Sequence, residues 1–198
     1  MKDAFSRIYQ NRLWNGRVSA SGPGSDLEET AVVRVELLKI IEVFGVKSIL
    51  DAPCGDFNWM KELTLPEYIG IDIVPEIITE NIRKYGPRFL MGDLRVAPLP
   101  KVDLILCRDC LAHLTLEDGQ KIIENFRKSG SKFLLATTYP RTWPNHNTPF
   151  WTVDGLVHDL TPGDCREVNL EIAPFDLGRA HIRLQENNAG KELGLWKL

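Results

Sequence analysis

The stretch from Ser48 to Asp56 constrains the fold of this chain more than any other. A short apolar run ends at Asp51, and a compact turn with a single glycine, Gly55, follows it. Asp56 then begins a segment, 56–63, that we expect to be helical. A strand that passes through a tight turn into a helix brings bare backbone N–H groups close to a ligand, and the carboxylate of Asp51 adds an acceptor. The stretch therefore predicts the first element of a nucleotide-type cofactor site at the carboxyl edge of a parallel sheet.

The same alternation of strand-like and helix-like segments continues along the chain. Short apolar runs that end in turn residues alternate with stretches that repeat apolar residues at helical spacing. The pattern predicts an α/β fold: a doubly wound, mostly parallel seven-stranded sheet with an antiparallel C-terminal hairpin and helices on both faces. We expect strands at 48–51, 68–73, 88–91, 102–107, 132–138, 181–185 and 192–196, and helices at 27–44, 56–63, 75–86 and 115–128.

Capping residues mark the start of three of these helices. Ser25 or Asp26 can cap the first, with Glu28 as the partner of Ser25 in a capping box. Pro75 begins the third, because its fixed φ suits the first turn of a helix. Thr115 begins the fourth.

The composition is that of one globular domain over residues 1–198, with 43% hydrophobic residues, 26% charged residues and a formal net charge of −3. This charge gives no footprint for nucleic acid or for an anionic membrane, so we expect neither partner. No run approaches the roughly 20 apolar residues of a membrane span. The polar N-terminus is unlike a signal peptide, and the four cysteines lie in or beside apolar segments. We therefore expect a cytoplasmic protein with free thiols.

Acidic residues close successive strand-like runs. Asp51, Asp72 and Asp93 end or follow the first three, and Asp109 follows the fourth. In such a sheet the strand ends meet along one crevice, where ligands bind. Asp72 comes 21 residues after Asp51, which is the separation at which a second-strand acid reaches ribose hydroxyls. Asp93, one strand further along, is placed to accept a hydrogen bond from an adenine amino group.

These residues resemble the motifs of the class I, Rossmann-like, S-adenosylmethionine-dependent methyltransferases, over essentially the whole chain. Ile49–Gly55 resembles the first motif of that family, Tyr68–Asp72 the ribose motif and Gly92–Leu94 the adenine motif. Val102–Asp109 resembles the strand that follows the adenine motif, and the C-terminal hairpin is another feature of the family. The resemblance implies a methyltransferase with S-adenosyl-L-methionine as its cofactor.

The resemblance also implies where the cofactor lies. Asp51 and Gly55 are expected to face its methionine part, Asp72 its ribose and Asp93 its adenine. The complete set of expected cofactor-binding residues is Ser21, Gly22, Asp51, Ala52, Pro53, Cys54, Gly55, Asp72, Ile73, Asp93, Leu94 and Arg108.

The first motif departs from the family pattern. The usual Asp-x-Gly-x-Gly-x-Gly becomes Asp-Ala-Pro-Cys-Gly-Asp-Phe at 51–57, which keeps one glycine of three. A dinucleotide needs glycines so that the backbone can approach its pyrophosphate, whereas S-adenosylmethionine has no phosphate. The departure therefore favours a methyltransferase over an NAD- or FAD-dependent dehydrogenase.

Two segments outside the strands are expected to cover the site. Residues 1–26 form an N-terminal segment over the cofactor or the substrate, although its turn at 19–25 can also be simple punctuation before a helix. Trp14 and Trp59 either form walls of the pocket or pack in the core. Residues 139–180 form a loop region rich in Pro, Asn and Trp on the substrate side.

The candidate catalytic residues follow the fourth strand. Methyl transfer from a sulfonium is an in-line displacement at carbon, and a hydroxyl acceptor must often lose a proton. His113 suits the role of general base because the ordinary pKa of histidine lies near neutrality, although a histidine satisfied in the core is nearly as common. Asp109 orients His113 or the substrate; it can instead hold a divalent metal, but no full ligand set accompanies it. Cys107 and Cys110 have CxxC spacing without a second pair, so we expect core or crevice thiols and no metal site.

The methyl acceptor is predicted from two sequence motifs that the chain lacks and from the composition of the loop at 139–155. The Asn/Asp-Pro-Pro-Tyr signature of amino-directed methyltransferases is absent, with 108–111 in its place, and so is the Gly-x-Ser-x-Gly elbow of α/β hydrolases. The tryptophan-bearing loop at 139–155 suits a small polar acceptor, so we expect O-methylation of a sugar hydroxyl in a glycan or nucleotide sugar. Trp143, His146 and Asn147 are the expected substrate contacts. The alternatives are N- or O-methylation of another small metabolite and a catalytically inactive binding subunit.

Overall fold

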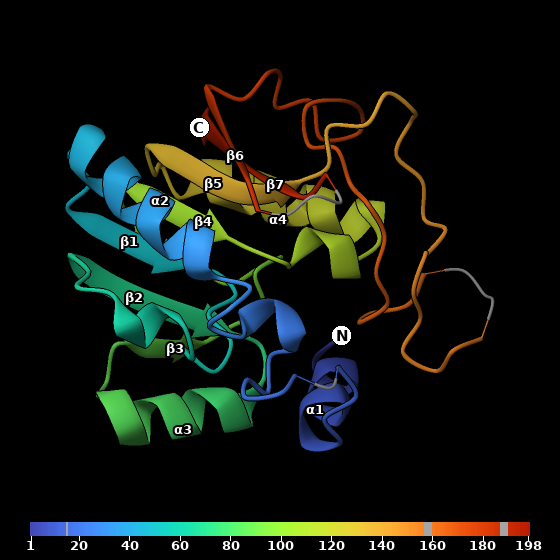
Figure 1. The fold of residues 1–198 in the computed structure, drawn as a ribbon, viewed down its shortest axis with the longest axis horizontal. Helices are drawn as coiled ribbons and strands as arrows, with labels where there is room; N and C mark the ends of the chain where they lie inside the picture. Colours follow the sequence, from blue (N-terminus) through green and yellow to red (C-terminus); the bar gives the residue numbers. More distant parts are fainter. Residues whose placement is uncertain (15, 157–159, 187–189) are drawn as a thin grey trace.

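A seven-stranded sheet with the strand order β3-β2-β1-β4-β5-β7-β6 forms the centre of the molecule (Figure 1). The structure is a computed structural model that describes residues 1–14, 16–156, 160–186 and 190–198. Strands β1 to β5 run parallel to one another, and β7 pairs antiparallel with both β5 and β6. The predicted fold class is confirmed. The strands are β1 (Ser48–Asp51), β2 (Glu67–Asp72), β3 (Phe89–Met91), β4 (Leu104–Cys107), β5 (Phe133–Thr138), β6 (Ile182–Gln185) and β7 (Glu192–Lys197).

Four α-helices and three short 3-10 helices are found in the described part of the chain. None of these helices combines the length and the apolar composition needed to span a membrane. The α-helices are α1 (Lys2–Gln10), α2 (Ala31–Val43), α3 (Pro75–Tyr85) and α4 (Leu116–Lys128), and the 3-10 helices are η1 (Pro23–Ser25), η2 (Met60–Glu62) and η3 (Leu111–His113).

The helices cover both faces of the sheet. On one face Leu37 of α2 and Ile78 of α3 join Leu104 in a buried cluster. On the other face Phe126 of α4 joins Ile105. Neighbouring strand residues point to opposite faces, so Leu104 and Ile105 separate into the two clusters. Because both faces are buried, the carboxyl ends of the strands are left as the place for a ligand.

The third and fourth predicted helices begin and end as expected. α3 starts at Pro75 and stops before Gly86. The φ of Gly86 is 94°, which is incompatible with a right-handed helix. The Oγ1 atom of Thr115 accepts a hydrogen bond of 3.2 Å from the backbone N–H of Asp118, which caps α4.

The predicted cap of the first long helix is wrong. α2 begins at Ala31, with Thr30 at its N-cap position, rather than at residue 27. The carboxylate of Asp26 is occupied elsewhere, because its Oδ1 accepts hydrogen bonds of 3.1 Å from the N–H groups of Val18 and Ser19. Asp26 therefore holds the N-terminal segment instead of capping a helix.

The predicted α-helix at 56–63 is also wrong. Gly55 and Phe57 have φ angles of 52° and 58°, and such left-handed residues interrupt a right-handed helix. The chain forms turns here and only the short η2 further on. The turn therefore offers no helix N-terminus at this point, and its N–H groups donate within the protein, as those of Gly55 to Asp72 and of Asp56 to Ser21 do.

The loop region at 139–180 runs from β5 past α4 and back to β6, along one end of the sheet (Figure 1). Two of its parts pair with each other in an isolated antiparallel bridge between Trp151 and Cys165. The inner part also lies against η3, because the N–H of Arg166 donates to the carbonyl of Ala112 at 3.0 Å. The loop region is thereby attached to the strand ends.

Candidate active site

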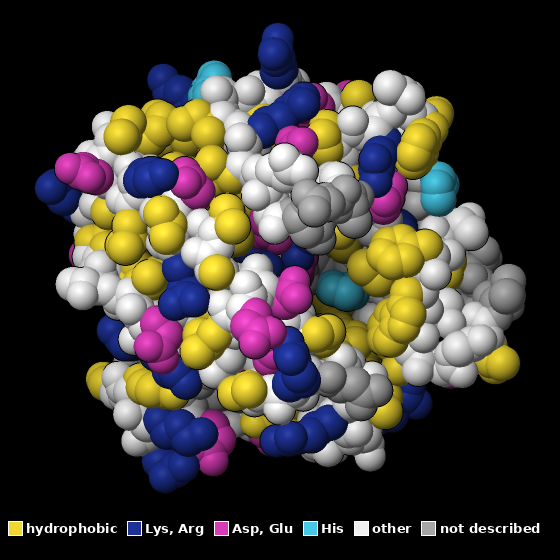
Figure 2. Space-filling model, viewed as in Figure 1, with side chains coloured by type: hydrophobic (Ala, Val, Ile, Leu, Met, Phe, Trp, Pro, Cys, Tyr) yellow, Lys and Arg dark blue, Asp and Glu magenta, His cyan; other side chains and the backbone are white. Residues whose placement is uncertain are grey.

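A cavity of about 1000 Å³, part of it open to solvent, lies at the carboxyl ends of the parallel strands. Figure 2 shows a hollow near the middle of the corresponding face of the molecule. Most residues predicted for the cofactor and for catalysis line this cavity. They are Ser21, Asp51, Pro53, Cys54, Gly55, Asp72, Ile73, Asp93, Leu94, Arg108, Asp109 and His113.

Asp72 holds the turn after β1. Its Oδ2 atom accepts a hydrogen bond of 3.1 Å from the N–H of Gly55, and its Oδ1 atom one of 2.9 Å from the N–H of Val74. Burial raises the pKa of Asp72 to about 6, although the backbone donors oppose the rise. The two oxygens are fixed in direction, and each keeps a lone pair for a donor such as a hydroxyl.

Asp51 is a second buried carboxylate in the same wall. The hydroxyl of Tyr68 donates to its Oδ2 atom at 2.7 Å. Burial raises the pKa of Asp51 to about 7, and the neighbouring charge of Asp72 adds to the rise. Two buried acids with raised pKa values favour a cationic group beside them, because a cation stabilises their ionised forms.

Asp93 lines the cavity after β3 and is held by a guanidinium. Arg95 donates to it from Nη2 at 2.6 Å and from Nε at 3.0 Å, and Arg95 also reaches Asp118. The hydrogen bonds from Arg95 hold the pKa of Asp93 below its usual value. Asp93 is therefore an ionised acceptor at neutral pH.

The N-terminal turn packs directly on the turn after β1. The carboxylate of Asp56 accepts hydrogen bonds from Ser19 Oγ at 2.9 Å and from the N–H of Ala20 at 2.7 Å. The N–H of Asp56 donates in return to Ser21 Oγ at 2.9 Å. A Cβ atom at Gly55 would collide with that hydroxyl, so only glycine allows the close approach. The turn at 19–25 is therefore part of the cavity wall rather than simple punctuation.

The guanidinium of Arg108 joins three distant parts of the chain. It donates to the carbonyl of Gly24 at 2.8 Å and to Glu186 at 2.8 Å, and it lies 3.3 Å from Asp109. Lys191 Nζ lies 2.5 Å from Asp109 and 2.9 Å from Glu186. Burial would raise the pKa of Asp109, but Arg108 and Lys191 outweigh it and hold that pKa well below its usual range. η1, the end of β4 and the β6–β7 hairpin are thus joined by one charged cluster.

His113 ends η3 and lines the cavity with its ring. Its Nδ1 atom lies 2.8 Å from the carbonyl oxygen of Asp164. A carbonyl oxygen can only accept, so Nδ1 carries the hydrogen, and the neutral ring has its lone pair on Nε2. Burial lowers the pKa of His113, although the charge of Asp109 opposes the shift. The ring is oriented through Nδ1 by Asp164 rather than by Asp109, and it is a neutral base at neutral pH.

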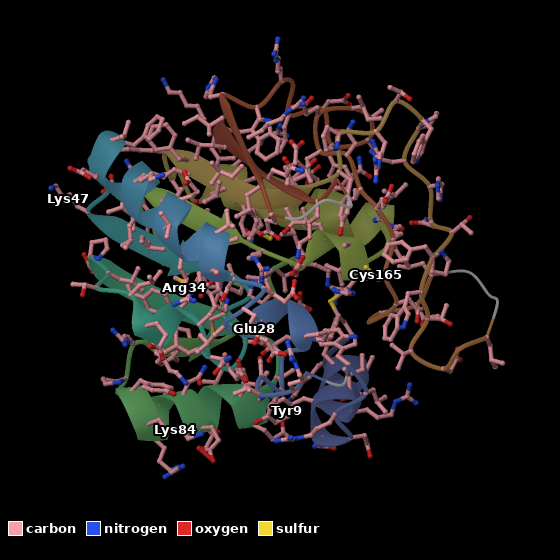
Figure 3. All side chains as sticks on the ribbon, in the orientation of Figure 1. Tyr9, Glu28, Arg34, Lys47, Lys84 and Cys165 are labelled. Carbon is pink, nitrogen blue, oxygen red and sulfur yellow. The ribbon has the colours of Figure 1, made fainter. Side chains whose placement is uncertain are left out.

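Trp14 forms the wall next to His113. The two rings are 4.9 Å apart between centroids, and the indole N–H of Trp14 donates to the carbonyl of Gly163 at 2.9 Å. Phe5 and Tyr9 of α1 also line the cavity, and Figure 3 shows Tyr9 on the side of α1 toward α3. Of the two alternatives for the tryptophans, Trp14 forms a wall of the cavity, whereas Trp59 both lines the cavity and packs in a buried core cluster.

Several lining residues were not predicted. The spacing of Phe5 and Tyr9 by four residues, on an otherwise polar segment, is the signal that could have indicated an apolar helix face there. The remaining residues lack a comparable signal, because backbone turns and helix packing place them. The unpredicted lining residues are Met1, Phe5, Tyr9, Ala20, Ser25, Val74, Ile77, Cys110, Leu114 and Ile122.

Two residues predicted for the cofactor do not line the cavity. Ala52 is buried beside β4, where its N–H donates to the carbonyl of Leu106 at 2.8 Å. Gly22, with a φ of 97°, packs against the side chain of Trp14. Both act on the site only through the backbone turns to which they belong.

The three residues predicted for the substrate also lie outside the cavity. Trp143 is 51% exposed and lies over the guanidinium of Arg141 in a separate, smaller hollow. The side chain of Asn147 accepts a hydrogen bond from the N–H of Leu116, and Nδ1 of His146 accepts one from its own loop. The three side chains contact their own loop region and the start of α4, and their predicted contact with the substrate stays a prediction.

Both cysteines of the CxxC pair belong to the buried core, and Cys110 also lines the cavity. Cys107 and Cys110 are buried free thiols, and their mutual hydrogen bond together with burial raises the pKa of Cys107 well above its ordinary value. Among the residues that the structure describes, no three His, Cys, Asp or Glu side chains are grouped as metal ligands.

Comparison with solved structures identifies the fold. No family model and no curated protein sequence matches the chain. Human N-acetylserotonin methyltransferase in complex with SAM is similar with a TM-score of 0.61 and 16% identity over 86% of this chain, which spans 53% of that protein. An S-adenosylmethionine-dependent methyltransferase from Clostridium acetobutylicum is similar with a TM-score of 0.60 and 16% identity over 99% of this chain and 98% of that one. PigF with SAH has a TM-score of 0.58 and 16% identity over 86% of this chain and 56% of its own length.

These structural neighbours share the overall fold of this chain. At identities of 15–16%, the comparison shows that the fold is shared, but it does not identify the substrate. The chain has the Rossmann-like fold of the class I S-adenosylmethionine-dependent methyltransferases.

Proposed function

We propose that this chain binds S-adenosyl-L-methionine and transfers its methyl group to a hydroxyl. The observation that carries the proposal is the convergence of Asp51, Asp72 and Asp93 on one cavity with a neutral histidine, His113. Structural neighbours that were crystallised with SAM or SAH support the choice of ligand.

The donor and acceptor groups in the cavity fit this ligand. The ligand has an ammonium and a sulfonium, two ribose hydroxyls and an adenine amino group, all of which suit carboxylate partners. Asp51 would hold the cationic methionine end, Asp72 the ribose hydroxyls and Asp93 the adenine amino group. Ser21, on the turn that packs against Gly55, would close the site over the methionine part.

His113 is the proposed general base. Bound S-adenosyl-L-methionine supplies an electrophilic methyl group on its sulfonium. The Nε2 lone pair of His113 takes the proton of the acceptor hydroxyl as the oxygen attacks, and the imidazolium that forms lies within the field of Asp109. The Nδ1–H bond to Asp164 keeps the ring in the tautomer that this role requires.

The acceptor that we propose is a sugar hydroxyl. The aromatic side chains next to His113, Trp14 and its neighbour Phe5, line the cavity and provide apolar faces on which a sugar ring can stack. The predicted contact from Trp143 is replaced in this proposal by Trp14, because Trp143 lies outside the cavity.

Two measurements test the proposal. Calorimetric titration with S-adenosyl-L-methionine and S-adenosyl-L-homocysteine is expected to show one site per chain, and absence of binding would remove the assignment. Incubation with methyl-labelled S-adenosyl-L-methionine and a panel of sugars, followed by mass spectrometry, is expected to show a mass increase of one labelled methyl group. Binding without transfer to any acceptor would favour a binding subunit instead.

A further inference from the structure

The indole of Trp14 lies against the ring of His113. Their centroids are 4.9 Å apart and their planes are inclined by 35°, which places the pair in the offset-stacked range rather than in the edge-on range. The indole N–H is directed elsewhere, since it donates to the carbonyl of Gly163 at 2.9 Å. Trp14 therefore offers the imidazole its π system and not a hydrogen bond.

Three parts of the chain fix the indole in this place. Phe5 of α1 lies edge-on to it, with 5.9 Å between the centroids and 61° between the planes. Gly163 of the loop region accepts its N–H. Gly22, in the turn at 19–25, is so close that a Cβ atom there would lie 3.2 Å from the Cβ atom of Trp14. The position of the indole is therefore set by tertiary contacts.

A short piece of backbone, 163–164, holds both rings. The N–H of Gly163 donates to the carbonyl of His113 at 3.1 Å, while the carbonyl of Gly163 accepts from Trp14. The carbonyl of Asp164 then lies 2.8 Å from Nδ1 of the imidazole. A Cβ atom at Gly163 would collide with the side chain of Ile8 in α1, so glycine is needed here. The spacing between the two rings is thus fixed by this turn.

The carboxylates near His113 give limited support to a positive charge on its ring. Burial lowers the pKa of His113, and the charge of Asp109 opposes this shift. Asp109 is itself bound by Arg108 and Lys191, which lie 3.3 and 2.5 Å from its Oδ2 atom. The carboxylate of Asp164 accepts hydrogen bonds from its own loop region. The imidazole therefore meets only the carbonyl of that residue.

The cations on this side of the cavity oppose a positive charge on His113. Lys191 adds to the effect of burial in lowering the pKa of His113. Arg166, two residues beyond Asp164, is a buried guanidinium that donates from Nη2 to the carbonyl of Leu114 at 2.7 Å. Its Nε and Nη1 atoms have no hydrogen-bond partner among the described residues. A neutral group that stabilises a cation would therefore be effective at this point.

The π face of an indole is such a group. It carries negative partial charge, so it attracts a cation that lies within about 6 Å of the ring centroid. The separation of 4.9 Å between the centroids of Trp14 and His113 is within that limit. The attraction is stronger away from water, and both residues are partly buried. A neutral imidazole carries no net charge and gains less, so the contact favours the protonated ring.

We propose that Trp14 is a positioning residue for the general base, and that its indole stabilises the imidazolium formed when His113 accepts the proton of the acceptor hydroxyl. In that step the O–H bond of the acceptor breaks and Nε2 binds the proton. The oxygen uses the freed electron pair to bond to the methyl carbon as the carbon–sulfur bond breaks. The effect of Trp14 on turnover rests on the proposed function. Its effect on the proton affinity of His113 does not, because it is present in the free chain.

The test compares two variants that differ chiefly in the π face. Trp14→Phe and Trp14→Leu both lose the donor to Gly163 and both keep an apolar side chain, but only Trp14→Phe keeps an aromatic face. Trp151→Leu is the matched control, because it removes an exposed indole that does not line the cavity. NMR of the imidazole follows the titration of His113 in the chain without ligands, and His113→Gln assigns the signal. Thermal unfolding checks that each variant is folded.

We expect the proton affinity of His113 to decrease in the order wild type, Trp14→Phe, Trp14→Leu, with a total loss of about three- to tenfold. The pH at which kcat falls on the acid side should move down by the same amount. The value of kcat at high pH should also fall, because a weaker base accepts the proton less readily. Trp151→Leu should change neither the titration nor kcat.

A second measurement leaves the side chain in place. Incorporation of 5-fluorotryptophan withdraws electron density from the indole faces with little change in shape. It should lower the proton affinity of His113 in the otherwise unchanged chain, and it should have no effect on that affinity in Trp14→Phe. If Trp14→Leu does not fold, this measurement decides.

An unchanged or higher proton affinity of His113 in Trp14→Leu, or equal values in Trp14→Phe and Trp14→Leu, would overturn the inference. So would a titration of His113 that does not respond to fluorination. If the titrations follow the expected order but the wild-type chain transfers no methyl group to a hydroxyl, the proposed function fails while the contact between Trp14 and His113 stands.

Discussion

The ring of His113 is fixed by the main chain of Asp164: Nδ1 lies 2.8 Å from its carbonyl oxygen. The same Asp164 uses its carboxylate to accept hydrogen bonds from the N–H groups of Val153 and Thr161, both at 2.8 Å. The loop region therefore sets the orientation of the histidine, although the histidine itself follows β4. A base that is held by a carbonyl keeps its tautomer over a wide pH range, because the acceptor does not titrate.

Replacement of the base tests its role most directly. His113→Ala is expected to lower kcat by about 10²–10⁴-fold, the usual contribution of a general base, and to leave cofactor affinity unchanged. Kinetics with the best acceptor measure the loss of kcat, and calorimetry with S-adenosyl-L-homocysteine measures the affinity for the cofactor. A variant that keeps its turnover would assign the proton transfer to another group.

The pH profile of the wild-type enzyme follows from the state of His113. Burial lowers the pKa of this histidine from its ordinary value of 6.5, and only the neutral ring accepts a proton. The value of kcat should therefore fall on the acid side with a midpoint below 6.5 and stay level above it. A loss of kcat at low pH with a midpoint above 6.5 would contradict the assignment. If the residual activity of His113→Ala shows no such loss at low pH, the assignment is supported.

Loss of the second carboxylate should weaken cofactor binding. Asp72→Ala removes a charged acceptor, which is expected to raise the Kd for S-adenosyl-L-methionine about 10–100-fold. Thermal unfolding is the control, because Asp72 also accepts from Gly55 and Val74. Asp72→Asn removes the charge but keeps an acceptor oxygen for one of the two N–H groups, which donate to different oxygens of Asp72. Unchanged affinity in both variants would exclude a ribose contact.

Asp56 should matter for the N-terminal turn. Its carboxylate accepts from Ser19 and Ala20, so Asp56→Ala leaves those donors without their partner. The expected cost is about 1–3 kcal/mol in the free energy of unfolding, measured with denaturant. Hydrogen exchange at residues 19–21 should speed up in the same variant, and Glu28→Ala, on the exposed surface, should leave that exchange unchanged.

The buried acids predict an unusual pH dependence of stability. Burial raises the pKa of Asp51 from its ordinary value of 3.8 to about 7, so the folded state binds its proton more tightly than the unfolded state. Its contribution to stability is full below pH 4 and is lost as the pH rises to about 7. The free energy of unfolding of Asp51→Asn, compared with that of the wild type, should therefore be more favourable at pH 8 than at pH 5 by a few kcal/mol. Both proteins are measured without cofactor. Equal differences at the two pH values would mean that Asp51 titrates normally.

The sheet and the acids at its edge were predictable because they rest on local rules. Apolar runs of the right length fold into buried strands, and residues such as Asp51 and Asp72 that end neighbouring parallel strands must meet at one edge. The starts of α3 and α4 were predictable for the same reason, since Pro75 and Thr115 act on the turn to which they belong.

The errors arise where distant contacts decide. Asp26 looks like a cap in the sequence, but it accepts from Val18 and Ser19 across a turn. The segment after Gly55 has helical composition, but Phe57 takes a left-handed φ of 58°. The predicted substrate contact of Trp143 stays a prediction, although its side chain lies outside the cavity, beside Arg141. The sequence pattern contains no information on these contacts.

The cluster around Arg108 has a consequence for the order of folding. Its guanidinium contacts Gly24, 84 positions earlier in the chain, and Glu186, 78 positions later. Contacts of such separation form late, because long loops must close first. A chain still emerging from the ribosome has its first motif long before Glu186 exists, so its cofactor pocket is assembled only after synthesis of the last hairpin. Any truncation that removes the hairpin should therefore abolish the pocket while the early strands still pair.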